Sequence, residues 1–461
     1  MDTLKPVKNK SERAPTIYSD GKRRWLYPDR RNGDKSKKRK KIAIFLIVVY
    51  VITPFLSLND LPLVRMDIST GIVSFWGYAF RFHDGSFTFF IFVIFALLLF
   101  LVTSVRGRVW CGYACPQTVW IDWVVRPLEE LLEGNAARRR ITDSKPLSVK
   151  IFLRKSLKHC LYFLLAAALS HVLLAYFVAP VEIFSWVTES PLKRWEVFLA
   201  VFLLTGAIYF DFAWFREQFC AFLCPYARFQ SVMMDDHTPV VAYDYNRGEP
   251  RGKKNSKGDC IDCQLCVRVC PTGIDIRKGL QLECIQCSRC VDACNMVMKN
   301  LKREPNLIGE FSSSAYQNKT TDTLLEKLKK PKNMFFFITL MFFVGFLIVR
   351  IQARNSIEIL LTRQAGTTYA QLEQGKYANL FRLNVINTTS KPQSVSLISS
   401  SSAIDVICSG CSVPLQAFEE KEFSLVVTTV ALATKQAELI VSPTGEKISL
   451  PFILPEKRQK Q

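Results

Sequence analysis

The chain has 461 residues, of which 49% are hydrophobic and 34 are phenylalanine, so it is long enough for several modules. Lysine and arginine outnumber aspartate and glutamate by 61 to 40, which gives a formal net charge of +21. The basic residues flank long apolar runs. This pattern is typical of a membrane protein with basic cytoplasmic faces and argues against a nucleic-acid-binding arm.

Five apolar runs are predicted to cross a membrane as helices, since a spanning helix needs about 20 apolar residues. They are Ile42–Leu58, Phe87–Val105, Cys160–Ala179, Val197–Phe215 and Met334–Val349. The first and last runs are short, and the neighbouring Lys41 and Arg350 are expected to snorkel to the interface. Buried helices of a soluble core are the alternative, but "FTFFIFVIFALLLFLV" has no polar face for water.

The charged flanks predict the orientation. Basic clusters precede the first run and lie between the second and third and between the fourth and fifth, so these segments are expected in the cytoplasm. The segments Asn59–Ser86 and Pro180–Glu196 are short and poor in basic residues, which places them outside. Five crossings then put the C-terminal part outside as well.

Two matched stretches, "WCGYACP" and "FCAFLCP", follow the second and fourth runs with the pattern C-x3-C-P. Proline is favoured at the first position of a helix, so each motif is predicted to end one helix and start another. Cys115 and Cys224 would then lie at helix starts, where the macrodipole lowers the pKa of a thiol. Together with Cys111 and Cys220 they are expected to converge. Copper, a further cluster, a dithiol pair and simple packing are the alternatives.

The segment between the fourth and fifth runs contains "CIDCQLCVRVCP" and "CIQCSRCVDACN", both with the spacing C-x2-C-x2-C-x3-C. In this pattern three thiolates hold one 4Fe–4S cluster and the fourth binds the neighbouring cluster. The predicted ligands are Cys260, Cys263, Cys266 and Cys294 for one cluster, and Cys284, Cys287, Cys290 and Cys270 for the other. Two zinc sites are the alternative, but their C-x2-C pairs do not continue at this rhythm. Asn295 replaces the proline found at Pro271, which affects only the local turn.

The C-terminal part contains β-rich stretches such as "YANLFRLNVINTT" and "KEFSLVVTTVAL", separated by polar turns, and is predicted to form an immunoglobulin-like sandwich. Cys408 and Cys411 lie in it as a candidate disulfide, an unused pair or a weak copper site. Elsewhere, Asp211 is expected to pair with a nearby arginine, and His171 to make a hydrogen bond between helices.

The combination of "RVWCGYACPQTVW", "EQFCAFLCPYARFQSVM" and "CIDCQLCVRVCPTGIDIRKGLQLECIQC" between membrane runs resembles the family of cytochrome c oxidase accessory proteins called CcoG, FixG or RdxA. This resemblance implies a membrane-bound polyferredoxin that reduces Cu(II) to Cu(I) for the copper site of a cbb3-type oxidase. More distant relatives imply the alternative of a quinol-linked electron conduit. A passive assembly scaffold is a third hypothesis.

The predicted architecture is therefore an α-helical membrane protein with an inserted ferredoxin-like domain and a C-terminal all-β domain. Its predicted parts are a basic flexible cytoplasmic tail (1–41), a four-helix membrane region (42–225), a ferredoxin-like domain with two 4Fe–4S clusters (226–333), a fifth transmembrane helix (334–351) and a periplasmic immunoglobulin-like sandwich (352–461).

The expected location is the bacterial cytoplasmic membrane. The expected partners are the oxidase assembly machinery and copper carriers, with no nucleic acid, and a homodimer is left open. No dinucleotide fingerprint is present, so electrons are expected from a separate carrier or from the quinone pool.

Overall fold

The computed structural model describes residues 16–451 except for positions 19, 59–60, 69–70, 82–84, 253–256, 319–322, 354–355, 364–368, 373–376, 390, 400–403, 409–411, 418, 430–435 and 443–444. The chain folds as two compact units. The first comprises residues 1–55 and 85–345, and the second comprises residues 56–84 and 346–461.

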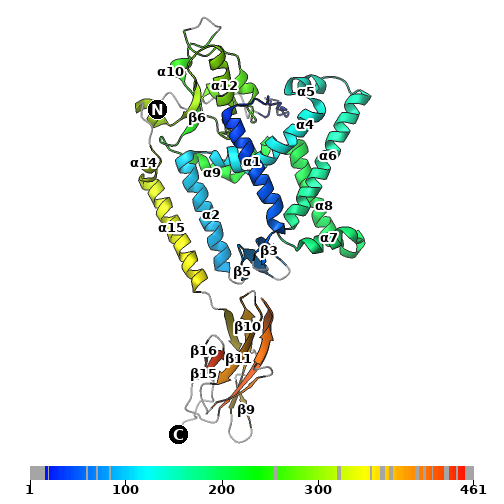
Figure 1. Ribbon diagram of the computed structural model, residues 1–461, viewed down its shortest axis with the longest axis vertical. Coiled ribbons are helices and arrows are strands. Elements are labelled where there is room, and N and C mark those ends of the chain that lie inside the picture. The colour runs from blue at the N-terminus through cyan, green and yellow to red at the C-terminus, as the bar shows by residue number, and fades with distance from the viewer. Residues whose placement is uncertain are drawn as a thin grey trace. The chain divides into compact units, whose positions relative to one another are not determined.

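Long helices dominate the first unit (Figure 1). They are α1 (Asp34–Ile52), α2 (Gly85–Arg106), α6 (Val149–Leu174), α8 (Trp195–Phe210) and α15 (Pro331–Gln352), the last of which continues into the second unit. Among the described residues, four stretches are long and apolar enough to cross a membrane: Thr88–Arg106, Val149–Leu174, Pro191–Phe215 and Pro331–Gln352. These stretches overlap the second to fifth predicted runs.

The first predicted run, Ile42–Leu58, is not one of these stretches. Its helix, α1, begins earlier, at Asp34, and its first turns carry lysine and arginine. The helix ends at Ile52, where a 3-10 turn containing Pro54 follows, because proline has no amide to continue the helix. The apolar part of α1 is thus shorter than the about 20 residues of an ordinary span, and the expected five-span count is not confirmed.

The N-terminus of α1 is bound to the cysteine-rich segment. The backbone N–H groups of Lys35 and Ser36 donate to the two carboxylate oxygens of Asp292, at 3.1 and 2.7 Å. A carboxylate at this position satisfies the free amides of a first helical turn and complements the helix dipole. A β-carbon on Gly33 would lie 2.2 Å from Cγ of Asp292, so only glycine fits there. The basic residues from position 34, predicted to belong to a flexible tail, are therefore helical and held.

Shorter helices connect the long ones. After α2 come the π-helical turn η2 (Trp110–Ala114), α3 (Pro116–Trp120), the π-helical η3 (Ile121–Val125), α4 (Arg126–Glu133) and α5 (Ala136–Asp143). After α6 come α7 (Pro180–Thr188), the 3-10 turn η4 (Pro191–Arg194), α8, the π-helical turns η5 (Asp211–Phe215) and η6 (Phe219–Leu223), and α9 (Pro225–Met233). Buried Val125, Tyr162, Leu169 and Phe212 pack these segments together.

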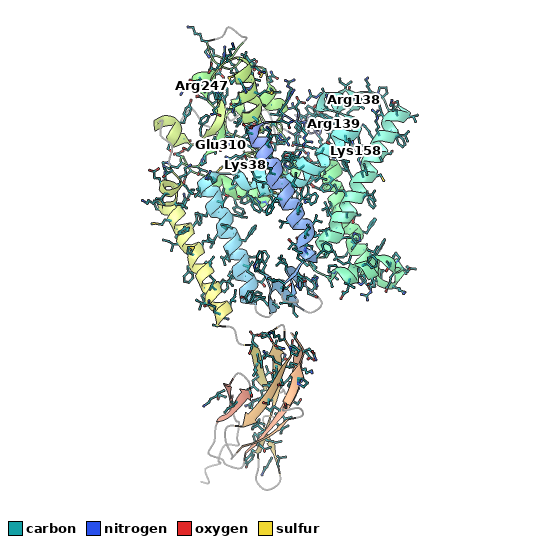
Figure 2. The ribbon with its side chains drawn as sticks, in the orientation of Figure 1. Lys38, Arg138, Arg139, Lys158, Arg247 and Glu310 are labelled. Carbon is teal, nitrogen blue, oxygen red and sulfur yellow. The ribbon has the colours of Figure 1, made fainter. Side chains whose placement is uncertain are left out.

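Charged side chains gather at one end of the first unit. Figure 2 shows Lys38 of α1, Arg139 of α5 and Lys158 of α6 at the same end as Arg247 and Glu310 of the cysteine-rich segment. The apolar helices extend away from this end (Figure 1). Such a separation of charged and apolar surface is typical of a protein that enters a bilayer from one side.

The cysteine-rich segment folds around a two-stranded antiparallel sheet of β6 (Val240–Tyr243) and β7 (Ile308–Phe311). Between the strands lie α10 (Tyr245–Gly248), α11 (Leu265–Arg268), the 3-10 turn η7 (Ile276–Lys278) and α12 (Arg289–Asn300); α13 (Ser313–Asn318) and α14 (Leu324–Leu328) lead on to α15. Its buried core contains Val241, Ile276 and Met298 together with Cys260 and Cys266. The cysteines are therefore part of the core that their own segment builds.

Beyond α15, the second unit is built from strands in the residues that the structure describes. One sheet has the order β12 (Ile404–Cys408), β14 (Glu420–Thr429), β10 (Tyr377–Asn387), β8 (Ile357–Arg363), with β9 (Ala370–Gln371) beside β10; the other has the order β13 (Ser412–Leu415), β11 (Gln393–Ser399), β15 (Gln436–Ser442), β16 (Glu446–Pro451). All pairs are antiparallel. Leu383, Val385 and Leu415 are buried between neighbours, as expected of alternating inward residues. Residues 56–84 add the short strands β1 (Ser57–Leu58), β2 (Leu61–Pro62), β3 (Val64–Asp67), β4 (Ile72–Phe75) and β5 (Tyr78–Arg81).

Candidate iron–sulfur and thiol site

The two C-x3-C-P motifs have the same local structure. In each, a π-helical turn ends at the residue before the second cysteine, and the proline begins the next helix. The amide of Cys115 donates to the carbonyl oxygen of Trp110 at 2.8 Å, and that of Cys224 to Phe219 at 2.9 Å. The prediction that each motif ends one helix and starts another is confirmed.

The four thiols of these motifs face one cavity of about 170 Å³. Its walls are mostly apolar and include Phe95, Trp110 and Phe219. At its edge, the Cys111 thiol donates to the side-chain oxygen of Gln230 at 3.6 Å. The structure therefore brings together Cys111, Cys115, Cys220 and Cys224, which come from two distant parts of the chain.

The spacing of these thiols limits what they can bind. Among the described residues, no three His, Cys, Asp or Glu side chains lie close enough to hold one metal ion. A pair of thiolates is sufficient for Cu(I), which prefers soft sulfur ligands. A 4Fe–4S cluster has an iron at each of four corners, so its thiolates stand farther apart than the ligands of a single ion.

The expected lowering of the thiol pKa at the helix start is wrong for Cys115. Burial raises the pKa of Cys115, and the backbone amides of Thr118 and Gln117 offset this only in part. Burial likewise raises the pKa of Cys111 to about 12 and also raises the pKa of Cys220. A protein interior disfavours the charged thiolate more than a helix N-terminus favours it. Metal binding at these thiols must therefore release protons.

The ferredoxin-type cysteines group in two sets. Burial raises the pKa of Cys290, and Cys287, Cys284 and Cys270 raise it further, with Cys266 as the weakest contributor. These four also line a small cavity, together with Cys266. We refer to Cys270, Cys284, Cys287 and Cys290 as the distal set.

The remaining four cysteines form the other group. Burial raises the pKa of Cys294 to about 12, and Cys260 and Cys263 act in the same direction. Burial likewise raises the pKa of Cys266 to about 12, and Cys294 and Cys263 act in the same direction. We refer to Cys260, Cys263, Cys266 and Cys294 as the proximal set. In both sets, one member comes from the other motif in the sequence.

The two cysteine loops share an unusual backbone that the sequence does not reveal. Asp262 and Gln264 flank Cys263 with φ of 54° and 55°, and Gln286 and Ser288 flank Cys287 with φ of 52° and 56°. Left-handed residues in such turns direct successive N–H groups into one concavity, an arrangement that binds anions, including iron–sulfur clusters. The residues and backbone of both sets thus fit a bound cluster.

The distal set lies beside the C-x3-C-P cavity. Cys111 packs with Ile285 and Cys287 in one buried cluster. Ile285 also lines the cavity itself. The first unit therefore presents a continuous sequence of sites from the proximal set, through the distal set, to the four converging thiols.

Gln117 connects the two C-x3-C-P copies. Its side-chain amide donates to the Asp211 carboxylate at 2.8 Å and to the carbonyl oxygen of Arg216 at 3.1 Å. Asp211 therefore has an amide partner from the first copy, and the nearby Arg216 also attracts its carboxylate, although the described residues include no ion pair between Asp211 and an arginine. Gln117 directly follows the proline of its motif, so this contact fixes the first cysteine pair relative to the second.

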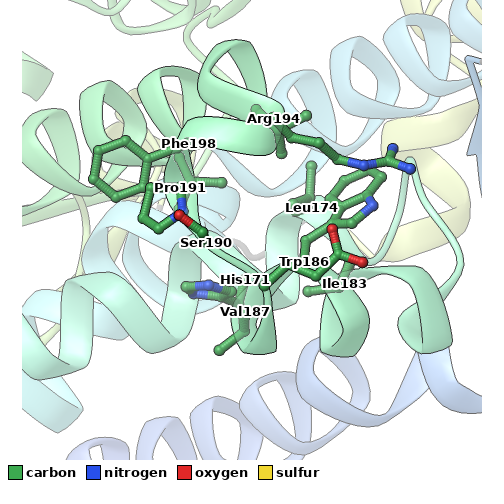
Figure 3. Close-up of a pocket in the computed structure, with 12 residues that line it drawn as sticks. His171, Leu174, Ile183, Trp186, Val187, Ser190, Pro191, Arg194 and Phe198 are labelled. Carbon is green, nitrogen blue, oxygen red and sulfur yellow. The ribbon is translucent and has the colours of Figure 1, made fainter.

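A second cavity of about 250 Å³ lies among α6, α7 and α8 (Figure 3). It is lined by His171, Trp186 and Phe198, with Arg194 stacked over the Trp186 ring at 5.4 Å. His171 Nδ1 donates to the carbonyl oxygen of Ala167 in its own helix at 2.7 Å, and this is not the interhelical bond that was expected. The candidate pair in the C-terminal part is not described: Cys411 and the side chain of Cys408 lie outside the described residues.

Comparisons with known families agree with this arrangement. A family described as a 4Fe-4S dicluster domain matches residues 215–257 and 251–314, and a 4Fe-4S binding domain matches residues 88–135. The Ig-like fold at the C-terminus of FixG matches residues 347–448. Together with the apolar helices, these matches show a membrane iron–sulfur protein that takes part in electron transfer.

Three curated relatives identify the family. Nitrogen fixation protein FixG of Rhizobium meliloti is 33% identical over 313 residues, which cover 64% of this chain and 58% of that protein. Proteins RdxA and RdxB of Cereibacter sphaeroides are 31% and 34% identical, over 78% and 79% of this chain and 79% and 80% of their own lengths. The chain belongs to the FixG/RdxA family.

One solved structure also matches, that of a FixG-related protein from Vibrio parahaemolyticus. It is 17% identical, covers 22% of this chain and 97% of its own, and has a TM-score of 0.18.

Proposed function

We propose that the protein reduces Cu(II) to Cu(I) for the copper site of a cbb3-type cytochrome c oxidase. The observation that carries the proposal is the convergence of Cys111, Cys115, Cys220 and Cys224 on one cavity beside the distal set. Thiolates favour Cu(I) over Cu(II), so a site built from them drives the reduction as well as holding its product.

The proposal assigns one 4Fe–4S cluster to each cysteine set. Such a cluster supplies one-electron transfer at a potential set by its surroundings. The eight thiolates hold the iron, and the left-handed residues around Cys263 and Cys287 direct backbone amides toward it. The fold thereby keeps the distal set next to the thiols to which the proposal assigns copper.

Reduction of Cu(II) to Cu(I) needs one electron and no other co-reactant. Cu(II) would bind at two of the four thiols, which release their protons. It would become Cu(I) on accepting one electron from the direction of the distal set. A separate one-electron carrier of low potential, or quinol, restores the electron. The apolar walls at Phe95, Trp110 and Phe219 limit access of water to the ion.

The proposed orientation places the cysteine-rich segment in the cytoplasm of a bacterial cell and residues 352–461 in the periplasm. The basic side chains at one end of the first unit support it (Figure 2). An odd number of crossings is needed. Four stretches qualify by length and composition, so this orientation assigns the fifth crossing to α1, whose apolar part is short.

A quinol-linked conduit is the second candidate, and the cavity among α6, α7 and α8 favours it. The cavity is largely apolar, and His171 and Arg194 supply polar groups within it (Figure 3). Glu189 also lines it. That combination suits the head group of a quinone, which needs apolar walls and a few hydrogen-bonding groups.

The experiment that separates the two candidates uses anaerobically purified protein in detergent. The protein is reduced with dithionite, freed of the reductant on a desalting column, and mixed with Cu(II) and a Cu(I)-specific chelator, or with a quinone analogue. Stoichiometric Cu(I) formation supports the first candidate. Oxidation by the quinone alone, with no Cu(I) formed, contradicts it.

A further inference from the structure

A buried carboxylate, Asp122, is surrounded by three guanidinium groups. Its Oδ2 accepts from Arg39 Nη2 at 2.9 Å and lies 3.3 Å from Arg289 Nη2, and its Oδ1 accepts from Arg126 Nη1 at 2.8 Å. All four side chains are at most 6% exposed. Burying four charged groups together costs desolvation free energy, which close pairing and hydrogen bonds must offset.

The network joins the two parts of the electron-transfer site. Arg39 comes from α1, and its Nε also donates to the carbonyl oxygen of Gly112, inside the first C-x3-C-P motif, at 2.7 Å. Arg126 donates to the carbonyl oxygen of Pro271, the residue after the distal ligand Cys270, at 3.2 Å. Arg289, the first residue of α12, lies between Cys287 and Cys290 and directly follows the loop of residues 284–288, which we call the distal loop.

The network carries excess positive charge next to the distal set. Its three guanidiniums face two carboxylates, Asp122 and Glu217, so three positive and two negative charges leave one positive charge buried. Two of the guanidiniums come from positions next to Cys287. Arg289 follows Cys287 by two residues, and Arg39 donates to Gly112, which lies against the backbone of Ile285 and Gln286.

The guanidinium groups of Arg39 and Arg289 also each have one N–H donor group without a hydrogen-bond partner in the part of the chain that the structure describes. Nη1 of Arg39 and Nη1 of Arg289 are buried without a hydrogen-bond partner among the described residues. A buried donor without a partner is unfavourable, and more so when it is charged. The sulfur atoms of a bound cluster would accept from these donors, which accounts for donors left open beside Cys287.

The proximal set lacks such an excess of positive charge. Arg277 acts on Cys266, but it pairs with both Asp275 and Asp262, which leaves one negative charge. Arg247, which acts on Cys294, and Arg303 share one partner, Asp259, at 2.9 and 3.9 Å, which leaves one positive charge. The charges of these groups cancel, so the surroundings of the proximal set favour added negative charge less than those of the distal set do.

We infer that Arg39 and Arg289 set the reduction potential of the distal centre above that of the proximal centre, so that electrons pass from the proximal set to the distal set and on to the converging thiols. Reduction adds one negative charge, and nearby positive charge and hydrogen bonds to sulfur stabilise the reduced form. One electron leaves the proximal centre and one enters the distal centre, with no proton transferred. The inference rests on the proposed clusters and is independent of copper.

The test is an anaerobic redox titration of the detergent-purified protein, followed by EPR. The wild type should show two one-electron steps at different potentials. Arg39→Gln should shift the upper step downward by at least tenfold in its equilibrium constant, which is 59 mV for one electron, and leave the lower step in place. Arg39→Lys, which keeps the charge, should leave the upper step close to its wild-type potential.

One variant serves as a control, and another assigns each redox step to one cysteine set. Arg268→Gln removes an exposed charge from α11 and should move neither step. Cys263→Ser identifies the proximal signal, which should be the lower one. Equal potentials, a proximal signal at the upper step, or an unshifted upper step in Arg39→Gln would overturn the inference. The order of the steps in the wild type decides even if Arg39→Gln fails to assemble its clusters, and a failed copper assay would leave the result unaffected.

Discussion

Gly112 lies directly against the backbone of the distal loop, since a β-carbon on this residue would be 2.7 Å from the carbonyl oxygen of Ile285. The carbonyl oxygen of Gln286 would be 2.9 Å away. The matched position in the second motif is Ala221, which carries the β-carbon that position 112 lacks. Glycine at position 112 thus lets the first C-x3-C-P motif approach the distal set closely.

Gly112→Ala should weaken this approach and lower the melting temperature of the purified protein, because a methyl group there overpacks rigid backbone at a cost of roughly 1–3 kcal/mol. Gly206→Ala is the matched control. It lies within α8 with no atom within 4 Å of its would-be β-carbon, so it should leave the melting temperature unchanged or slightly raised. Identical melting of the Gly112→Ala variant and the wild type would refute the close contact.

The crossing of ligands between motifs gives a second prediction. Cys294→Ala should abolish the same EPR signal as Cys263→Ala, although the two residues belong to different motifs. Cys270→Ala should abolish the same signal as Cys287→Ala. Iron analysis of each variant checks the loss. If Cys294→Ala instead removes the signal that Cys287→Ala removes, each motif holds its own cluster and the assignment of the two sets is wrong.

Much of this arrangement follows from local sequence. The C-x3-C-P spacing predicted the helix ends at Cys115 and Cys224, because proline and helix starts are tied by local geometry. The second to fifth apolar runs coincide with helices for the same reason, since a hydrophobic stretch of sufficient length is a local property. The β-rich stretches of residues 377–451 likewise coincide with strands.

The rest depends on contacts between distant positions. Arg39 stands in a row of lysines and arginines, and no local feature distinguishes it as the partner of Asp122, 83 positions away. The pKa of Cys115 was misjudged because a sequence shows the helix start and not the burial that outweighs it. The left-handed residues around Cys263 and Cys287 are not glycines, so composition did not mark those turns.

Glu129 predicts how stability depends on pH. It accepts from Arg216 at 2.6 Å and from Tyr162 at 2.7 Å, and it pairs with Arg139. Burial alone would raise the pKa of Glu129, but Arg216 and Arg139 outweigh it and lower the pKa from 4.5 to about 2. A carboxyl group with a lowered pKa stabilises the fold above its unfolded value, and this contribution is lost as pH falls toward the folded value.

The melting temperature should therefore fall between pH 5 and pH 3, and Glu129→Gln should make that fall shallower while lowering stability at pH 7. Thermal unfolding across this pH range measures both effects. Glu182→Gln, an exposed change in α7, is the control and should keep the slope of the wild type. An unchanged slope in Glu129→Gln would show that the carboxyl is not ionised in the fold.

The proposed orientation is tested with reporter fusions. A fusion after Arg303 should report the cytoplasm and a fusion after Gln461 the periplasm, because basic flanks remain on the cytoplasmic side. A further fusion within residues 59–60, after α1, should report the periplasm if this helix crosses. A cytoplasmic signal there would mean that α1 does not span and that the two ends of the protein share one side.

The central claim is tested most directly by measuring Cu(I) formation and iron content together in protein with Cys111, Cys115, Cys220 or Cys224 replaced by serine. Serine has nearly the same volume, but its oxygen is a harder ligand, so packing is largely preserved and copper binding is not. The variants are reduced, desalted and mixed with Cu(II) and a Cu(I)-specific chelator. They should keep the iron of both ferredoxin-type clusters, about eight atoms per chain by the motif count, and lose most of the Cu(II) reduction seen in the wild type. Full Cu(II) reduction in these variants would contradict the account, and loss of iron beyond that of the two clusters would show that the four thiols hold a third cluster and not copper.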